Sequence, residues 1–160
     1  GNFIGQENKE VGEYCRKQFR LKELVFMSWS QVMFHFEREL YKDPDQDLNK
    51  LWWDFVKKYQ LINFSRNKPD WASKIHLTNS PVYYHNYLLG KILASQLNNH
   101  IAKIILKQDA KKMDYSDKKV GDFLKEKIFF SGRRYRWDEL IRRALGEPLN
   151  PKYFIEEFTN

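Results

Sequence analysis

The sequence predicts an all-α fold, a multi-helix array, on three observations. Apolar side chains recur at three- and four-residue steps along most of the chain, as they do on one face of a helix. No segment alternates apolar and polar residues as a half-buried strand does. Of the 160 residues, 42% are hydrophobic and 16% aromatic, which favours a packed globule. We expect a single helical domain over residues 1–160.

Two apolar stripes predict the first helices. One runs from Leu21 to Leu40 and predicts a long helix, which Pro44 in "KDPDQD" interrupts because proline cannot continue a helix. The aspartates of that segment suit the cap and first turn of the next helix. The second stripe, from Leu48 to Tyr59, predicts that next helix, and the "NFSRNKPD" segment after it is typical of a loop.

A central helix is predicted from Pro81 to about Lys107. Ser80 suits its N-cap, and Pro81 suits its first helical position. The segment is apolar on nearly every face, so we expect other helices to enclose it as the central helix of something larger.

Three shorter helices are expected in the rest of the chain. "DYSDKK" caps a fourth helix that runs through Ile128. A fifth begins at Trp137 and is stopped by Gly146, and Asn150-Pro151 caps a last one.

The net charge of +7 raises the question of nucleic-acid binding. However, 21 acidic residues dilute the 28 basic ones, and this mixture is typical of solvated helical faces. We therefore expect no nucleic-acid partner, and a steep loss of binding with salt would be the sign of one. The densest basic cluster consists of Arg133, Arg134, Arg136, Arg142 and Arg143, interleaved with Tyr135 and Trp137.

Several other function classes lack their sequence signals. No run of about 18 uncharged apolar residues occurs, so no membrane span is expected. The lone Cys15 cannot form an internal disulfide. None of the four histidines belongs to an H-E-x-x-H pair, and "HFERE" at His35 lacks a second histidine one turn on, so no metal site is predicted. A G-x-S-x-G motif and a phosphate-binding glycine loop are also absent.

The stretch "SKIHLTNSPVYYHNYLLG" (73–90) is dense in groups able to hold or polarise a peptide carbonyl. On a helix Tyr84 and Tyr87 would project from one face, and in an extended segment Lys74 and His76 would point to the same side. Phenol and imidazole groups hydrogen-bond a developing oxyanion, and an ammonium group holds a carboxylate. The alternative is an ordinary core helix whose phenols bond to neighbours, and the residues alone leave both interpretations open.

Three segments of the chain resemble the C-terminal catalytic half of zinc peptidases of the angiotensin-converting-enzyme (peptidyl-dipeptidase) and oligopeptidase F families. "LNKLWWDFVKKYQLI" (48–62) is similar to their K-x-W-W helix, and "DWASKIHLTNSPVYYHNYLLGKILASQL" (70–97) to their lysine-x-histidine segment and Y-x-x-Y helix. "FFSGRRYRWDELIRRALGEPLNPKYFIEEF" (129–158) is similar to their closing W-x-x-L-x-x-x-A-T-G-x-x-L-x-x-x-Y-F element. The resemblance covers most of the chain from about residue 20 onward and implies the C-terminal helical part of a larger α-helical metallopeptidase.

The resemblance implies a role for each polar residue of the stretch. Lys74 would bind the C-terminal carboxylate of a peptide substrate, and His76 would hydrogen-bond the substrate backbone near the scissile bond. Tyr84 would reach the substrate terminus, and the Tyr87 phenol would stabilise the tetrahedral intermediate. The alignment needs one inserted residue before Tyr84, so Tyr83 is an alternative for the first functional phenol.

The segments that bind zinc in these families lie upstream of the matched ones. There H-E-x-x-H and a later glutamate supply the ligands, but here no histidine pair precedes Glu7, Glu10 or Glu13. We therefore expect zinc as the cofactor of a full-length enzyme and no metal on this chain. Asn86 stands where the converting enzymes place a chloride-binding arginine, which leaves chloride activation open.

The predicted function is the substrate-binding and transition-state-stabilising part of a zinc-dependent peptidase, a peptidyl-dipeptidase or oligopeptidase, that hydrolyses short peptides. The chain opens on Gly-Asn, so we expect upstream sequence and no activity from this part alone. The alternative is a non-catalytic helical interaction module derived from the same family. If the helix from Pro81 keeps an apolar face exposed, a homodimer of the fragment is the expected way to cover it.

Overall fold

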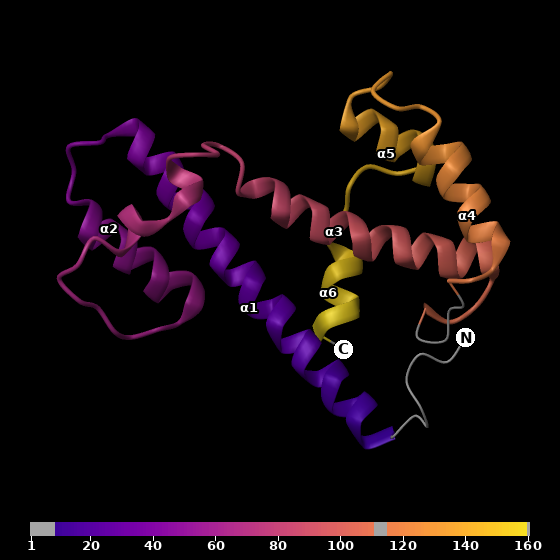
Figure 1. Cartoon of the computed structure of the whole chain (residues 1–160), viewed down its shortest axis with the longest axis horizontal. Coiled ribbons are helices and arrows are strands. Elements are labelled where there is room, and N and C mark those ends of the chain that lie inside the picture. Colours follow the sequence, from indigo (N-terminus) through magenta and orange to yellow (C-terminus); the bar gives the residue numbers. More distant parts are fainter. Residues whose placement is uncertain (1–8, 111–114, 160) are drawn as a thin grey trace. The chain divides into compact units, whose positions relative to one another are not determined.

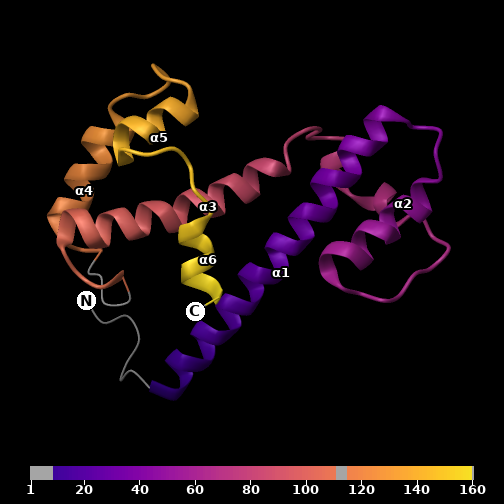
Figure 2. The same cartoon turned by 180° about the vertical axis from the view of Figure 1, so that it is seen from behind.

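The computed structural model describes residues 9–110 and 115–159. These residues form six α-helices with short 3₁₀- and π-helical stretches, and no strand occurs among them (Figure 1, and from behind in Figure 2). The predicted all-α fold class is therefore confirmed. The chain forms two compact units, one ending at Leu88 and the other beginning at Leu89, each with a core of its own. Across the described residues, no helix has the length and apolar character that crossing a bilayer requires.

The first unit is built on α1 (Lys9–Lys42) and α2 (Leu48–Phe55), and α2 continues as a π-helix over Val56–Gln60. The two apolar stripes predicted from the sequence pack against each other here. An apolar helix face leaves water only when another element covers it, so each stripe gives the other its partner. The buried core consists of Val32, Met33, Phe36, Trp52, Val56 and Tyr84.

The turn between α1 and α2 is fixed by side chains of the "KDPDQD" segment. Asp47 caps α2, because its Oδ1 accepts the Lys50 N–H at 2.9 Å and satisfies an amide that has no partner within the helix. The side-chain amide of Gln46 donates to the carbonyl oxygens of Glu39 and Asp43 at 2.9 and 2.7 Å. The end of α1 is thereby tied to the start of α2, as the predicted aspartate cap requires.

The loop predicted after α2 is present and is held by few contacts. Arg66 donates two hydrogen bonds of 2.8 Å to Asp70, and its carbonyl oxygen accepts from Trp53 Nε1 at 3.0 Å. Two short 3₁₀-helices follow, over Asp70–Ser73 and Ile75–Leu77. These turns place the polar stretch next to α1.

The prediction that the central helix begins at Pro81 is wrong. Helix α3 spans His85–His100 and continues as a π-helix over Ile101–Leu106. Val82 has a φ of 54°, in the left-handed region, and a helix cannot run through such a residue. The predicted end was accurate, since Lys107 adopts a left-handed φ of 55° and stops the helical run.

The second unit contains the rest of α3 together with three shorter helices. These are α4 (Lys118–Leu124) with its π-helical extension over Lys125–Phe129, α5 (Trp137–Leu145) and α6 (Lys152–Thr159). All three match helices predicted from the sequence. The core they enclose consists of Ile101, Val120, Phe123, Ile141, Ala144 and Leu145.

The helix ends of this unit follow the predicted signals. Asp117 caps α4 by accepting the Lys119 N–H at 2.9 Å, while Asp114 of the predicted capping segment lies outside the described residues. Gly146 ends α5 with a φ of 79°, a conformation that glycine adopts without steric cost. Asn150 Oδ1 accepts the first backbone N–H of α6 at 3.0 Å.

One buried polar side chain fixes the connection between α5 and α6. Gln96 of α3 is 1% exposed and donates from Nε2 to the Pro148 carbonyl oxygen at 3.0 Å. Its Oε1 accepts the Asn150 N–H at 2.9 Å. Both ends of the side-chain amide are therefore bonded to the backbone of one loop.

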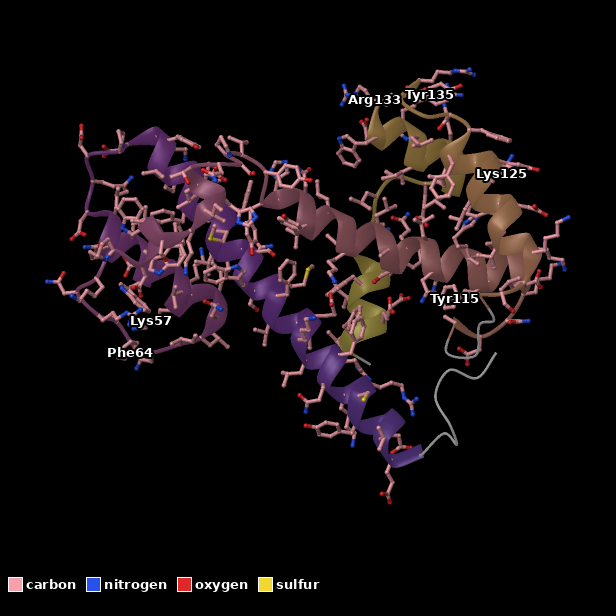
Figure 3. The ribbon with its side chains drawn as sticks, viewed as in Figure 1. Lys57, Phe64, Tyr115, Lys125, Arg133 and Tyr135 are labelled. Atoms are coloured by element: carbon pink, nitrogen blue, oxygen red, sulfur yellow. The ribbon has the colours of Figure 1, made fainter. Side chains whose placement is uncertain are left out.

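The basic cluster of this unit is partly neutralised by neighbouring acids. Arg136 pairs with Asp138 at 3.2 Å, and Arg143 pairs with Glu139 at 2.6 Å. The Arg143 guanidinium also lies 4.3 Å from the ring centroid of Tyr135, which is labelled in Figure 3. Part of the positive charge is thus held within the unit itself.

Candidate functional site

The polar stretch lies in the first unit, and its backbone differs from the extended conformation expected for its start. Lys74 is extended, with φ −86° and ψ 104°. The next residues form the 3₁₀-helix Ile75–Leu77, in which the Leu77 N–H bonds to the Lys74 carbonyl oxygen at 2.9 Å. The prediction that Lys74 and His76 alternate along an extended segment is therefore wrong. A turn brings both side chains to the aromatic residues around α1.

The Lys74 ammonium group lies over two indole rings. Its Nζ is 5.2 Å from the ring centroid of Trp29 and 5.7 Å from that of Trp52, and the two indoles meet edge to face at 5.6 Å. A cation over an aromatic face is stabilised by about 0.5–1 kcal/mol at a partly exposed site. None of the ion pairs among the described residues includes Lys74, so its ammonium hydrogens are available to an anion.

The His76 ring lies between two phenols. Its ring centroid is 4.9 Å from that of Tyr84 and 5.6 Å from that of Tyr87, edge to face in both cases. His76 Nε2 is 3.3 Å from the Tyr87 hydroxyl, and the tautomer decides which of the two donates. His76 and Tyr87 therefore form a polar pair that includes one ionisable nitrogen.

The three tyrosines differ in exposure. Tyr84 is 7% exposed, and its hydroxyl accepts the Trp29 Nε1–H at 2.5 Å. Burial raises the pKa of Tyr84, so the phenol stays protonated and keeps its own hydrogen to donate. Tyr83 and Tyr87 are 48% and 41% exposed, and their rings meet edge to face at 5.6 Å. The Tyr84 and Tyr87 rings are 5.2 Å apart, so all three phenols belong to one cluster.

A buried carboxylate holds the turn that leads into this cluster. Glu37 of α1 is 6% exposed, and its Oε1 accepts the Val82 N–H at 2.5 Å. A left-handed backbone costs a non-glycine residue roughly 1–2 kcal/mol, and Val82 is β-branched. A hydrogen bond to a charged group contributes about 1.5–3 kcal/mol, which is enough to offset that cost.

Trp29 and Glu37 were not among the predicted site residues. Trp29 was counted only as a member of the apolar stripe of α1, although its Nε1–H needs a partner when the ring is partly buried. Glu37 follows Phe36 and lies four residues after Met33, so it is an acid on the buried face of the helix. Such an acid is seldom found without a bonding partner, and this is the signal that could have identified Glu37.

The described residues do not fit a zinc site. They contain no group of three or more His, Cys, Asp and Glu side chains that could hold a metal ion. A catalytic zinc ion needs about three such protein ligands. The chemistry available to this cluster is hydrogen bonding by imidazole and phenol groups, together with attraction of anions by Lys74.

The comparisons with known proteins identify a peptidase family. Residues 32–160 match the family described as carboxypeptidase Taq (M32) metallopeptidase. The chain is 28% identical over 111 residues to thermostable carboxypeptidase 1 of Pyrococcus furiosus, covering 69% of this chain and 22% of that protein. It is 23% identical over 162 residues to carboxypeptidase 1 of Bacillus subtilis, covering 99% of this chain and 32% of that protein. No solved structure is significantly similar.

These matches support the predicted metallopeptidase class but not the finer angiotensin-converting-enzyme or oligopeptidase F type. The chain spans between about a fifth and a third of the length of the curated relatives that it matches. The family match covers well over half of the chain and includes every residue of the predicted site. The chain therefore belongs to the carboxypeptidase Taq (M32) metallopeptidase family.

Proposed function

We propose that this chain forms the peptide-binding face of a metallocarboxypeptidase, and that it holds the C-terminus of a short peptide. The observation that carries the proposal is Lys74, whose ammonium group lies over two indoles, beside the His76–Tyr87 pair, with no acidic partner among the residues that the structure describes. The two curated relatives are named carboxypeptidases, which supports a substrate with a free C-terminal carboxylate.

Lys74 binds the C-terminal carboxylate in this proposal. The indoles of Trp29 and Trp52 limit the positions open to its side chain, so less side-chain entropy is lost on binding. They also shield one side of the ammonium group from water, which strengthens its attraction to an anion.

His76 and Tyr87 bind the peptide backbone near the bond to be cleaved. Tyr87 is 41% exposed, so its hydroxyl can reach a carbonyl oxygen and donate a hydrogen bond to it. His76 donates or accepts beside it, as its tautomer allows. Charge that builds up on a carbonyl oxygen is stabilised by donors already in place, and this pair supplies them.

The other two tyrosines have separate roles. Tyr84 is largely buried and bound to Trp29, so it orients the His76 ring and directs its remaining hydrogen toward the peptide. Tyr83 is exposed and packs against Tyr87, and it contacts the side chains of the peptide.

The proposed role of this chain is to bind and orient the peptide, and it needs no metal on these residues. Zinc belongs to the proposal only as the cofactor of a longer enzyme, bound by other residues. A peptidyl-dipeptidase is the second candidate, favoured by the lysine-x-histidine and Y-x-x-Y spacing of Lys74, His76, Tyr84 and Tyr87. The first product released by the longer enzyme separates the two, because a carboxypeptidase frees single amino acids and a peptidyl-dipeptidase frees dipeptides.

A titration of this chain with a short peptide and with its C-terminal amide tests the binding role. The free carboxylate should bind about 10- to 100-fold more tightly, the range expected when a charge-assisted hydrogen bond is added. Lys74→Met should abolish this preference, while Lys58→Met should keep it. Lys58 is the matched control because its Nζ also lies over an aromatic ring, 5.0 Å from the centroid of Tyr59.

Equal affinity for the two peptides in the unsubstituted chain would remove Lys74 from carboxylate binding. If neither peptide binds, the interaction-module alternative is the better account of the chain.

A further inference from the structure

We propose that Glu37 is a positioning residue for this site: by binding the Val82 N–H, it sets the turn that presents Tyr83 and Tyr87 to His76. The inference rests on the proposed peptide-binding function for its consequence, but the geometric part can be tested without any peptide. Glu37 is not proposed to contact the substrate or a metal. It acts through the backbone of Val82.

Glu37 lies on the buried side of α1, next to the fully buried Phe36. A carboxylate in such a place must find donors, because burial without them is costly. Among the described residues Glu37 has two such donors, the Val82 N–H at 2.5 Å and the Tyr41 hydroxyl at 3.4 Å. The shorter bond joins residues 45 positions apart, so it is a tertiary contact that local sequence does not dictate.

The connection between His76 and Tyr83 has little else to hold it. Residues 78–82 are exposed, and the backbone hydrogen bonds found for this connection among the described residues lie at its two ends, from Leu77 to Lys74, from Thr78 and Asn79 to Ile75, and from Asn86 to Tyr83. Between those ends, the Val82 N–H ties the connection to α1 by donating to Glu37. Val82 also adopts a left-handed conformation that a valine rarely takes unless its surroundings impose it.

Two side chains of α1 therefore bind residues 82–84 at different points. Trp29 binds the Tyr84 hydroxyl, and Glu37 binds the Val82 amide. If Glu37 is removed, the turn relaxes while Trp29 still holds Tyr84. The His76–Tyr87 pair should then be disturbed far more than the Trp29–Tyr84 pair.

Three variants test this inference: Glu37→Ala, Glu37→Gln and the control Glu39→Ala. Glu37→Gln keeps an oxygen that can accept from Val82. Glu39 lies on the same helix but pairs with Arg38 and Lys42. Because Val82 is 62% exposed, water can satisfy its amide in Glu37→Ala, so this variant should fold.

The first readout is nuclear magnetic resonance of the chain without peptide. Glu37→Ala should raise the exchange rate of the Val82 amide hydrogen and abolish contacts between the His76 and Tyr87 rings, while the Trp29 indole signal stays close to its original position. Glu37→Gln should restore the ring contacts, and Glu39→Ala should leave them unchanged. Ring contacts that survive in Glu37→Ala would overturn the positioning role.

The second readout is affinity for the short peptide with a free C-terminus. Glu37→Ala should weaken binding about tenfold, because a small misplacement of oriented groups is costly, whereas Glu37→Gln should weaken it less than about threefold. If the unsubstituted chain binds no peptide, the proposed function fails while the ring contacts still decide the role of Glu37. Should Glu37→Ala not fold, the ring contacts should still survive in Glu37→Gln and in Glu39→Ala, and their loss in either variant would contradict the proposal.

Discussion

Each unit contains a buried polar side chain on a helix that binds the backbone of a loop, and the two loops carry different side chains. In the first unit, Glu37 binds the Val82 amide, and the segment that follows presents exposed tyrosines. In the second unit, Gln96 binds the backbone of Pro148 and Asn150, and this connection joins two helices. The same kind of bond thus fixes the turn before the candidate site in one unit and a helix connection in the other.

The two units differ in whether their polar side chains are fully hydrogen-bonded within the fold. Gln96 satisfies both ends of its amide within the fold, so its bonds contribute only to stability. Around the candidate site of the first unit, Lys74 has no acidic partner within the described part of the chain and Tyr87 is 41% exposed, so polar groups are left available. Groups that fold-stabilising contacts leave unused are those that can bind a substrate.

The largest effect is expected at Tyr87 in a longer enzyme that carries the metal site. Tyr87→Phe should lower kcat about 100- to 1000-fold with little change in KM, because the phenol is needed most when charge builds up on the carbonyl oxygen. Steady-state kinetics measure this, with Tyr135→Phe in the second unit as the control. A rise in KM with unchanged kcat would assign Tyr87 to ground-state binding instead.

A second prediction concerns the loop that Gln96 binds in the second unit. Gln96→Leu should lower the free energy of unfolding by about 2–4 kcal/mol, since it leaves one carbonyl and one amide of a loop unsatisfied. Urea unfolding measures the loss, and Asn99→Leu on the same helix is the control. Peptide affinity should not change in Gln96→Leu, and a large change would mean that the two loops do not have separate roles.

How far the sequence predicts this molecule depends on the range of the interactions. The helices α1, α2, α4, α5 and α6 follow from apolar periodicity and from caps such as Asp47 and Gly146, which act over a few residues. The start of α3 was missed because Ser80-Pro81 has the local signature of a helix start. The bond from Glu37 to Val82 and the left-handed φ of Val82 override that signature.

The sequence predicted which side chains belong to the candidate site better than it predicted how they are arranged. A resemblance to peptidases pointed to Lys74, His76 and the tyrosines, and the structure gathers them in the first unit. The placement of Lys74 over two indoles depends on Trp29, which lies 45 positions away in the chain. Packing between residues so far apart in the chain produces no periodic pattern in the sequence, so the position of Lys74 could be known only from the structure.

A third prediction compares one histidine in each unit. Burial lowers the pKa of both His35 and His100, and the positive charges of Arg38 and Lys58 lower that of His35 further. The unfolded chain therefore binds more protons than the folded one below the ordinary histidine pKa of about 6.5. Stability should be fully present above that pH and should fall as the pH drops toward the lowered values.

Chemical unfolding of the chain between about pH 7.5 and 5 measures this loss, which should be modest. His35→Gln and His100→Gln should each remove part of the pH dependence, because burial is the largest cause of the lowered pKa at both histidines. If the stability of both variants depends on pH as it does in the unsubstituted chain, the carboxylates and not these histidines cause the dependence.

The smallest effect is expected at the left-handed turn. Val82→Gly should leave the free energy of unfolding unchanged or raise it by less than about 1 kcal/mol, because glycine adopts a positive φ without steric cost. Val25→Gly is the matched control, since Val25 is 52% exposed against 62% for Val82 but lies within α1. There glycine should destabilise the helix by roughly 0.5–1 kcal/mol, and an equal cost at Val82 would contradict the strain assigned to the turn.

The central claim, that the first unit presents a peptide-binding face, is tested most directly by the histidine signals of the chain. A short peptide with a free C-terminus should shift the ring signals of His76 as it binds, together with those of Tyr87 and the Trp29 indole. His35 and His100 serve as controls within the same spectrum, and their signals should stay in place. Shifts confined to His100, or saturable binding that leaves His76 unmoved, would contradict the account.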